Sequence, residues 1–184
     1  SYFPVDLGAM AAKLEFVEMR RQGLEYGDVA IQSTETNHPG MDLAYRFTSG
    51  GRSVVYLTDH ETYQTMNQVT EYARKQDKLI EDFCRGADLL VADSQYTEEE
   101  YRAKRTWGHS RFIDTVQLGL DAKVKRLALF HHDPTHSDAQ LDGILRQSLE
   151  IVERQGGGLE VLMAKEGLAV EHIRANGNTP EQIC

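Results

Sequence analysis

The chain has 184 residues, of which 40% are hydrophobic and 27% are charged, as is typical of a single globular domain. Its formal net charge of -9 excludes a broad basic surface, so we expect no extended contact with a nucleic-acid backbone. No apolar run approaches the length of a membrane span, and the two cysteines, Cys84 and Cys184, lack metal-binding spacing, which predicts a cytoplasmic protein with reduced thiols.

The first part of the chain is predicted to form strands joined by turns. The predicted strands cover residues 14–19, 28–33, 42–48 and 52–59. The loop TETNHPG, which contains His38, separates the second strand from the third, and its proline and glycine predict a sharp turn. The last two strands are linked only by Ser49, Gly50 and Gly51, which predicts a β-hairpin.

The second part alternates helices with strands. Apolar residues at helical spacing predict helices over residues 61–84, 97–105, 111–122 and 137–155. Continuous apolar runs predict strands buried on both faces at residues 87–92 and 124–130. Thr97 is the expected N-cap of its helix, with Glu100 at the capping-box position. This order of elements predicts an α/β layered domain with a mixed sheet.

The end of the chain is predicted to close the sheet. Residues 159–173 predict a final hairpin with Glu166 and Gly167 as its turn, and residues 173–184 are expected to form a flexible tail. The folded domain is therefore expected to cover residues 1–172.

Four polar residues follow strands or a strand-forming run: His38, Asp59, Asp93 and His131. Binding residues gather at strand ends because the sheet fixes their positions. Histidine with carboxylate is a ligand set suited to zinc, manganese or iron. Each residue also has a structural alternative, since an aspartate at such a junction can cap a helix and a histidine can end a strand or sit in a turn. The joint pattern favours a metal site.

Five motifs in a fixed order give a resemblance to a known family: NHPGMDLAYRF, GRSVVYLTD, ADLLVADSQYTEEEY, GHS and KRLALFHHDP. Together they resemble the carboxy-terminal two thirds of a metallo-β-lactamase-fold hydrolase, in the branch near ribonuclease Z and cyclic-nucleotide phosphodiesterase-like proteins. The resemblance implies an αββα layered sandwich that is incomplete in this chain.

The resemblance also implies roles for individual residues. His38 would bind one metal ion, Asp59 would bridge two, and His131 would bind the second. Asp93 would orient His109 as a proton donor to the leaving group, as a carboxylate can do by fixing the imidazole tautomer. His132 is an alternative to His131, because neighbouring residues of an extended segment point to opposite sides.

The family's HxHxDH motif, which supplies four further ligands, is absent, and His38 is the first histidine of the sequence. We therefore expect this chain to be a fragment that is inactive without that segment; a non-catalytic or inactive module is the alternative. The chain opens on SYFPVDL without an initiator methionine.

The expected activity is hydrolysis of phosphodiester bonds in a small, cyclic-nucleotide-like substrate, with two divalent ions, zinc in the first instance, sharing a bridging hydroxide. A ribonuclease Z type of RNA processing is the alternative. The tRNA-cleaving relatives carry a long Gly/Pro-rich arm where this chain has only Ser49, Gly50 and Gly51, and this favours the small substrate. Exposed strand edges and apolar faces would also make a homo-oligomer the expected state.

Overall fold

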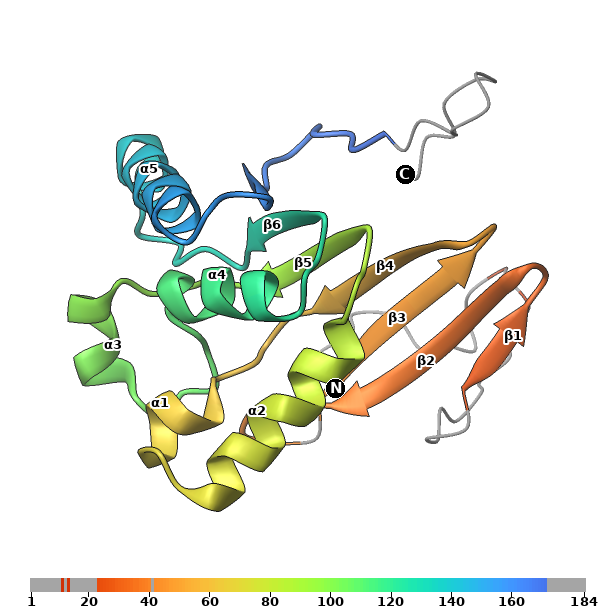
Figure 1. Ribbon diagram of the computed structural model, residues 1–184, viewed down its shortest axis with the longest axis horizontal. Helices are drawn as coiled ribbons and strands as arrows, with labels where there is room; N and C mark the ends of the chain where they lie inside the picture. The colour runs from red at the N-terminus through yellow and green to blue at the C-terminus, as the bar shows by residue number, and fades with distance from the viewer. Residues whose placement is uncertain (1–10, 12, 14–22, 41, 172–184) are drawn as a thin grey trace.

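The structure is a computed structural model that describes residues 11, 13, 23–40 and 42–171 (Figure 1). Its centre is one seven-stranded sheet in which the strands neighbour one another in chain order. The strands are β1 Leu24–Tyr26, β2 Val29–Glu35, β3 Leu43–Ser49, β4 Arg52–Leu57, β5 Leu89–Asp93, β6 Arg126–Phe130 and β7 Glu160–Met163. β1 to β4 are antiparallel, and β4 to β7 are parallel. The predicted mixed sheet is therefore confirmed.

The hairpin predicted between residues 42 and 59 is present as β3 and β4. Gly50 and Gly51 form its turn with positive φ angles of 54° and 75°, and Ser49 pairs directly with Arg52. Two successive left-handed residues match the right-handed twist of the flanking strands, and glycine adopts them without steric cost. The short link expected from the sequence is thus confirmed.

Five helices connect the strands: α1 Tyr63–Asn67, α2 Glu71–Cys84, α3 Glu98–Lys104, α4 Phe112–Asp121 and α5 Asp138–Arg154. The irregular start expected for the helix over residues 61–84 is a real break, because Gln68 has a φ of 63° and Thr70 begins α2 by accepting a hydrogen bond from the Ala73 N–H. The capping box of Thr97 and Glu100 at the start of α3 is confirmed.

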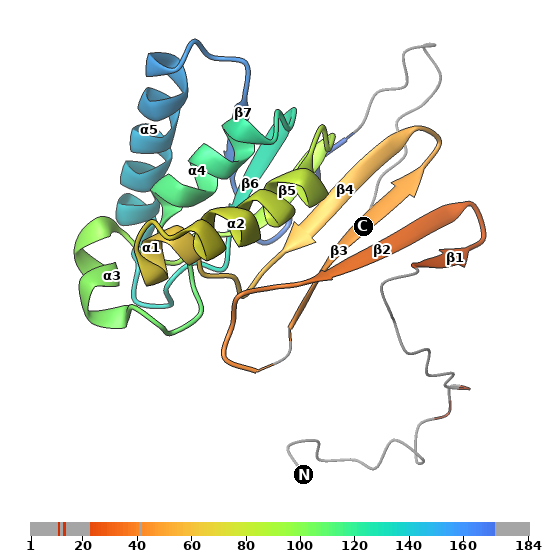
Figure 2. The same ribbon diagram turned by 60° about the horizontal axis from the view of Figure 1, so that its bottom comes forward.

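Helices α2, α4 and α5 lie on one face of the sheet (Figure 2). Their apolar side chains meet those of the central strands in the core, for example Ile80, Val116 and Ile144 against Leu57, Leu90 and Leu127. β5 is buried on both faces, as its continuous apolar sequence predicts. Complete burial of such aliphatic side chains contributes roughly 1.5–3 kcal/mol each, so the core fixes the positions of the strand ends.

The predicted hairpin over residues 159–173 is wrong. β7 is a single strand that pairs in parallel with β6, and residues 164–171 form no strand. The long helix α5 carries the chain back across the sheet before β7, so β7 enters in the same direction as β6. Glu166 and Gly167 do form a turn. The strand expected at residues 14–19 and the tail expected at 173–184 lie outside the described residues.

Cys84 lies in the core at the end of α2, with none of its surface exposed. Burial raises the pKa of its thiol to about 12, so the group stays protonated at neutral pH. No helix in the described ranges is both long enough and apolar enough to cross a membrane.

Candidate metal centre

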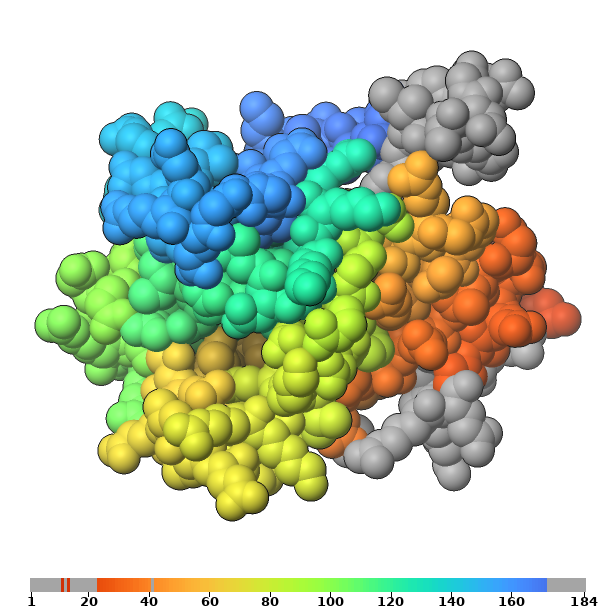
Figure 3. Space-filling model, viewed as in Figure 1, coloured from red at the N-terminus to blue at the C-terminus, as the bar shows by residue number. Residues whose placement is uncertain are grey.

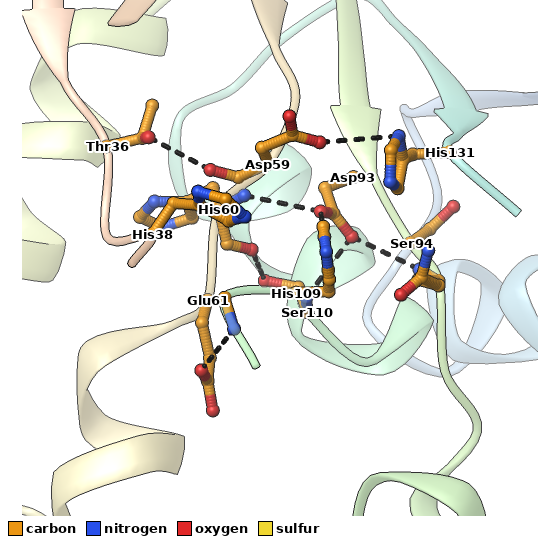
Figure 4. A network of polar contacts seen from close by, with 12 residues as sticks. Thr36, His38, Asp59, His60, Glu61, Asp93, Ser94, His109, Ser110 and His131 are labelled. Atoms are coloured by element: carbon orange, nitrogen blue, oxygen red, sulfur yellow. Dashed lines mark hydrogen bonds and ion pairs between the residues drawn. The ribbon is translucent and has the colours of Figure 1, made fainter. Parts of the chain in front are cut away.

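The parallel strands β4, β5 and β6 bring three of the expected site residues to one edge of the sheet. Asp93 is the last residue of β5, His131 follows β6 directly, and Asp59 lies two residues after β4. Because neighbouring parallel strands end at the same edge, their terminal residues are close although they are far apart in the sequence. Figure 4 shows Asp59, Asp93 and His131 directed into the same region.

Two loops add a histidine each to this edge. His38 comes from the loop between β2 and β3, and His109 comes from the segment between α3 and α4. The ring of His109 stacks on that of His131 with 4.7 Å between centroids, and it lies 5.3 Å from the ring of His38. The structure therefore brings all five expected residues together.

Asp59 and His131 both have left-handed backbone conformations, with φ angles of 52° and 58°. Such angles are uncommon for residues with a side chain and are maintained only where the surrounding structure imposes them. For Asp59, the Thr36 hydroxyl donates a hydrogen bond of 2.9 Å to its carbonyl oxygen. The two residues face each other, with 3.4 Å between the Asp59 Oδ1 and the His131 Nδ1.

Two groups of side chains place ligand atoms within 4.8 Å of one another: Asp59, Asp93, His109 and His131, and His38, Asp42 and Asp59. Asp59 belongs to both. The Oδ1 of Asp59 and the Nδ1 of His38 are buried and make no hydrogen bond of normal geometry, although the first lies in an ion-pair contact with the His131 Nδ1 and the second with the Asp42 carboxylate. A buried polar atom without a good hydrogen bond is costly, and a cation bound between these two groups would contact both atoms. The oxygen and nitrogen donors therefore fit a divalent metal ion.

Asp93 differs from Asp59 because its oxygens already have partners. Its Oδ1 accepts hydrogen bonds of 3.2 Å from the backbone N–H groups of Gln95 and Ser110, and its Oδ2 accepts one of 3.2 Å from the His60 N–H. The Oδ2 also lies 2.7 Å from the Nδ1 of His109. Asp93 is thus placed to orient His109 and has no free oxygen for a metal.

The charge of Asp93 also affects the protonation of His109. Burial alone lowers the pKa of His109, but the hydrogen bond and negative charge of Asp93 outweigh it and raise the pKa above its ordinary value. With Nδ1 hydrogen-bonded to a carboxylate, Nε2 is the nitrogen available to another group.

His60 is a buried neighbour of the centre. Its Nδ1 accepts a hydrogen bond of 3.1 Å from the Asn37 N–H, and burial lowers its pKa to about 4. The ring is therefore neutral at neutral pH and its Nδ1 is occupied. His60 also lines a polar cleft of about 340 Å³ between α1, α2 and α4 (Figure 3), to which none of the five expected site residues contributes.

The neighbouring histidines His131 and His132 point to different places. The Nε2 of His132 lies 3.1 Å from the carbonyl oxygen of Ala164, beyond the end of β7, and His132 belongs to neither group of ligand atoms. The two side chains therefore diverge, although the left-handed backbone of His131 means that the segment is not the extended one that the alternation of a strand would require. His131 is the histidine that faces Asp59.

Residues 4–132, more than half of the chain, match the family described as Beta-lactamase superfamily domain. The chain belongs to the beta-lactamase superfamily. Within this superfamily it is similar to ribonuclease Z of Saccharolobus solfataricus, with 32% identity over 95 residues that make up 48% of this chain and 32% of that protein. With ribonuclease Z of Brevibacillus brevis it shares 24% identity over 130 residues, 71% of this chain and 36% of that protein. The chain thus spans about a third of the length of these two relatives.

Solved structures of the metallo-β-lactamase fold resemble this superfamily member. YhfI from Bacillus subtilis, described as a metallo-beta-lactamase fold protein, superimposes with a TM-score of 0.58 and 22% identity over 80% of this chain and 50% of that chain. Unliganded yeast PDE1 gives 0.61 and 11% over 82% and 48%, and the short form of human tRNase Z gives 0.51 and 18% over 79% and 42%. At these identities the likeness shows the fold, and the expected metallo-β-lactamase-like α/β fold is confirmed.

Sequence reasoning missed two acidic residues of this superfamily site. Asp42 follows His38 by four residues in the sequence, and its carboxylate lies against the Nδ1 of His38. Glu61 is buried beneath the centre with 1% of its surface exposed. Asp42 could have been found from its i, i+4 spacing to His38, whereas Glu61 carries no signal because its partners come from a distant segment.

Proposed function

We propose that this chain forms part of a divalent-metal-dependent hydrolase that cleaves phosphodiester bonds. One observation carries the proposal: His38, Asp59 and His131 converge, with Asp59 shared by two groups of ligand atoms, directly beside the Asp93–His109 pair. Structural histidines and capping aspartates, the alternatives for each residue alone, would not require this convergence. The solved structures support the fold, and the proposal of chemistry depends on the side chains.

His38, Asp59 and His131 would hold the metal, with Asp59 shared between two ions, zinc in the first instance and manganese or iron as alternatives. Bound there, divalent ions would polarise a phosphoryl oxygen and lower the pKa of a water molecule, which is the chemistry that phosphodiester hydrolysis needs. In this set the Asp59 carboxylate supplies one negative charge, and the imidazoles of His38 and His131 supply two nitrogen donors.

His109 would supply a proton to the departing oxygen. Its Nδ1 is fixed by Asp93, so the ring is held in one orientation with Nε2 free. A positioned imidazole of this kind accelerates the loss of a poor leaving group by about 10²- to 10⁴-fold. Asp93, with 2% of its surface exposed, would act on His109 alone and would not contact the substrate.

A small phosphodiester is the substrate that the chain favours. The β3–β4 link is formed only by Gly50 and Gly51, so no arm extends from this hairpin to hold a large RNA. The net charge of -9 also disfavours an extended phosphate backbone. RNA processing of the ribonuclease Z type is the second candidate, because both curated relatives described above carry that name.

Metal analysis tests the ligand set. We expect the chain alone to bind metal weakly, because it supplies three ligands, and a version joined to an HxHxDH segment to bind about two ions tightly. Tight stoichiometric metal in the chain alone would contradict this ligand count. In the joined protein, Asp59→Asn and His131→Ala should each lower the metal content, whereas His132→Ala, which alters the adjacent histidine outside the cluster, should leave it unchanged.

Turnover tests the proton donor in the same joined protein. His109→Ala should lower kcat by about 10²-fold or more with a cyclic nucleotide while the metal content stays constant. An equal loss of metal would instead make His109 a ligand. Assays on bis(p-nitrophenyl) phosphate, a cyclic nucleotide and a precursor tRNA separate the two substrate classes. Activity on the precursor tRNA alone would overturn the small-substrate proposal.

A further inference from the structure

Glu61 is a buried carboxylate whose oxygens are both held by the segment that carries His109. Its Oε1 accepts a hydrogen bond of 2.9 Å from the Thr106 N–H and another from the Tyr101 hydroxyl. Its Oε2 accepts one of 2.9 Å from the Gly108 N–H. Figure 4 shows Glu61 beneath the centre. With 1% of its surface exposed, Glu61 would be costly to bury without these three donors.

The segment that Glu61 holds has a strained backbone at Thr106. Thr106 and Gly108 have φ angles of 72° and 93°, and Gly108 passes so close to the ring of His38 that a side chain there would collide with it. The next residue is His109. Glycine adopts such an angle without cost, but at a β-branched residue such as Thr106 it persists only where other contacts impose it, and the hydrogen bonds from Thr106 and Gly108 to Glu61 supply such contacts.

The backbone of Glu61 connects to the loop of His38. Its N–H donates to the Asn37 carbonyl at 2.9 Å, and the Asn37 side-chain amide donates to the Glu61 carbonyl at 2.7 Å. Glu61 also lies two residues after Asp59. One residue therefore joins three separate loops, those that carry His38, Asp59 and His109.

We infer that Glu61 is a positioning residue that sets His109 at its working distance from the metal-binding residues Asp59 and His38. The inference rests on the proposed function for the role of His109. Glu61 is not a metal ligand, since both of its oxygens accept hydrogen bonds from the protein, and it belongs to neither group of converging ligand atoms. It acts through the backbone of residues 106–108.

The Glu61→Gln substitution tests this inference because an amide cannot replace the carboxylate here. All three partners are donors, and a glutamine has only one acceptor atom. If the amide oxygen takes the Oε1 position, the NH₂ group faces the Gly108 N–H; if it takes the Oε2 position, the NH₂ group faces the Thr106 N–H. In either orientation one backbone N–H of the segment loses its acceptor.

The first measurement is amide hydrogen exchange by NMR on the chain itself. In Glu61→Gln we expect exchange at Thr106 and Gly108 to be faster by about ten-fold or more, since exchange reports local opening. Asp77→Asn is the matched control, because the hydrogen bonds of Asp77 go to the Tyr63 and Gln64 N–H groups at the start of α1 and to the Gln64 side chain. Unchanged exchange at both amides in Glu61→Gln would overturn the inference.

The second measurement is a comparison of leaving groups in the active joined protein. A misplaced proton donor matters for an alkoxide, which needs a proton, and matters little for p-nitrophenolate, which leaves as an anion. We expect Glu61→Gln to lower kcat by about ten-fold for a cyclic nucleotide and by less than about two-fold for bis(p-nitrophenyl) phosphate, with KM and metal content unchanged. An equal loss for both substrates would make Glu61 a purely structural residue and overturn the inference.

Tyr101→Phe provides a milder variant if Glu61→Gln does not fold. This substitution removes one of the three donors to Glu61 and leaves the two backbone hydrogen bonds available. We therefore expect kcat to fall again more for the cyclic nucleotide than for bis(p-nitrophenyl) phosphate, with the loss for the cyclic nucleotide about a third of that in Glu61→Gln. Equal effects on both substrates would again count against the inference. Failure of the wild-type protein to hydrolyse either substrate would defeat the proposed function alone, because the exchange measurement still decides whether Glu61 fixes the segment.

Discussion

Gly108 is the residue whose identity the site constrains most directly. Its φ of 93° belongs to the left-handed region, and a Cβ built on it would lie 2.6 Å from the Cδ of Pro39 and closer still to the ring of His38. Neither neighbour can move freely, because His38 faces Asp42 and the ring of Pro39 is fixed. Glycine is therefore required both for its conformation and for its size.

We expect Gly108→Ala to lower the free energy of unfolding by about 1–3 kcal/mol or more, from backbone strain and overpacking. Gly143→Ala is the control: Gly143 lies within α5, a Cβ there meets no atom within 4 Å, and alanine should raise stability by about 0.5–1 kcal/mol. Urea denaturation measures both. Identical midpoints for Gly108→Ala and the wild-type protein would show that the segment can rearrange at no cost.

Four of the five residues that converge at this edge could be predicted from the sequence because strand ends are visible in it. Asp59, Asp93 and His131 follow apolar runs, and the ends of parallel strands must meet at one edge. His38 follows a predicted strand in a turn, whereas His109 was implied only by the resemblance to the family. Glu61 could not be predicted, because its role depends on three hydrogen bonds from residues 40 to 47 positions away, which no local pattern records.

At the scale of elements, helix α3 connects its own capping to the site. Thr97 accepts a hydrogen bond of 3.3 Å from the Glu100 N–H, and the Glu100 carboxylate accepts one of 2.8 Å from the Thr97 N–H. The helix has only seven residues, so this reciprocal pair satisfies a large share of its free ends. Tyr101, which binds Glu61, lies on the same helix.

Thr97→Ala should therefore cost about 1 kcal/mol of stability and loosen the segment that follows α3. The stability loss is read from thermal unfolding and the loosening from amide exchange at residues 106–108. Arg102→Ala is the control, since Arg102 is exposed on α3 and should change stability by less than about 0.5 kcal/mol. Equal exchange rates in Thr97→Ala and the wild-type protein would show that the capping of α3 does not affect the order of residues 106–108.

The elements themselves were largely predictable because most have distinct periodicity and turn residues. The hairpin of β3 and β4, the buried strands β5 and β6, and the capping box of α3 follow local rules. The predicted hairpin after residue 159 failed because an apolar run does not record its direction. Whether β7 returns antiparallel or runs parallel depends on the crossover through α5, a feature of the whole sheet.

At the scale of the whole molecule, the sheet has one face covered by helices and one face on which no helix of the described residues lies (Figure 2). This helix-free face is apolar over β3 and β4: Phe47 pairs with Val54 and Tyr45 pairs with Tyr56, and the rings of Tyr56 and Phe130 lie 6.0 Å apart. Phe47 and Tyr56 are 37% and 40% exposed. An apolar surface shared by several strands is typical of an interaction site.

We predict that a second copy of the chain covers this face. Two such faces can pack as a sandwich of sheets, and burial of aromatic side chains would drive the association against repulsion between chains of net charge -9. Raising the salt concentration should then strengthen association, because salt screens repulsion between like charges and leaves apolar burial intact.

Light scattering over a range of protein concentrations checks the prediction. Phe47→Glu should shift the chain to monomer, because it adds a charge to the apolar face. Leu149→Glu adds the same charge at a residue of similar exposure, 46%, on α5 on the other side of the sheet, and should leave the association unchanged. A wild-type chain that stays monomeric at high salt and high concentration, or equal effects of the two variants, would show that this face does not mediate association between copies.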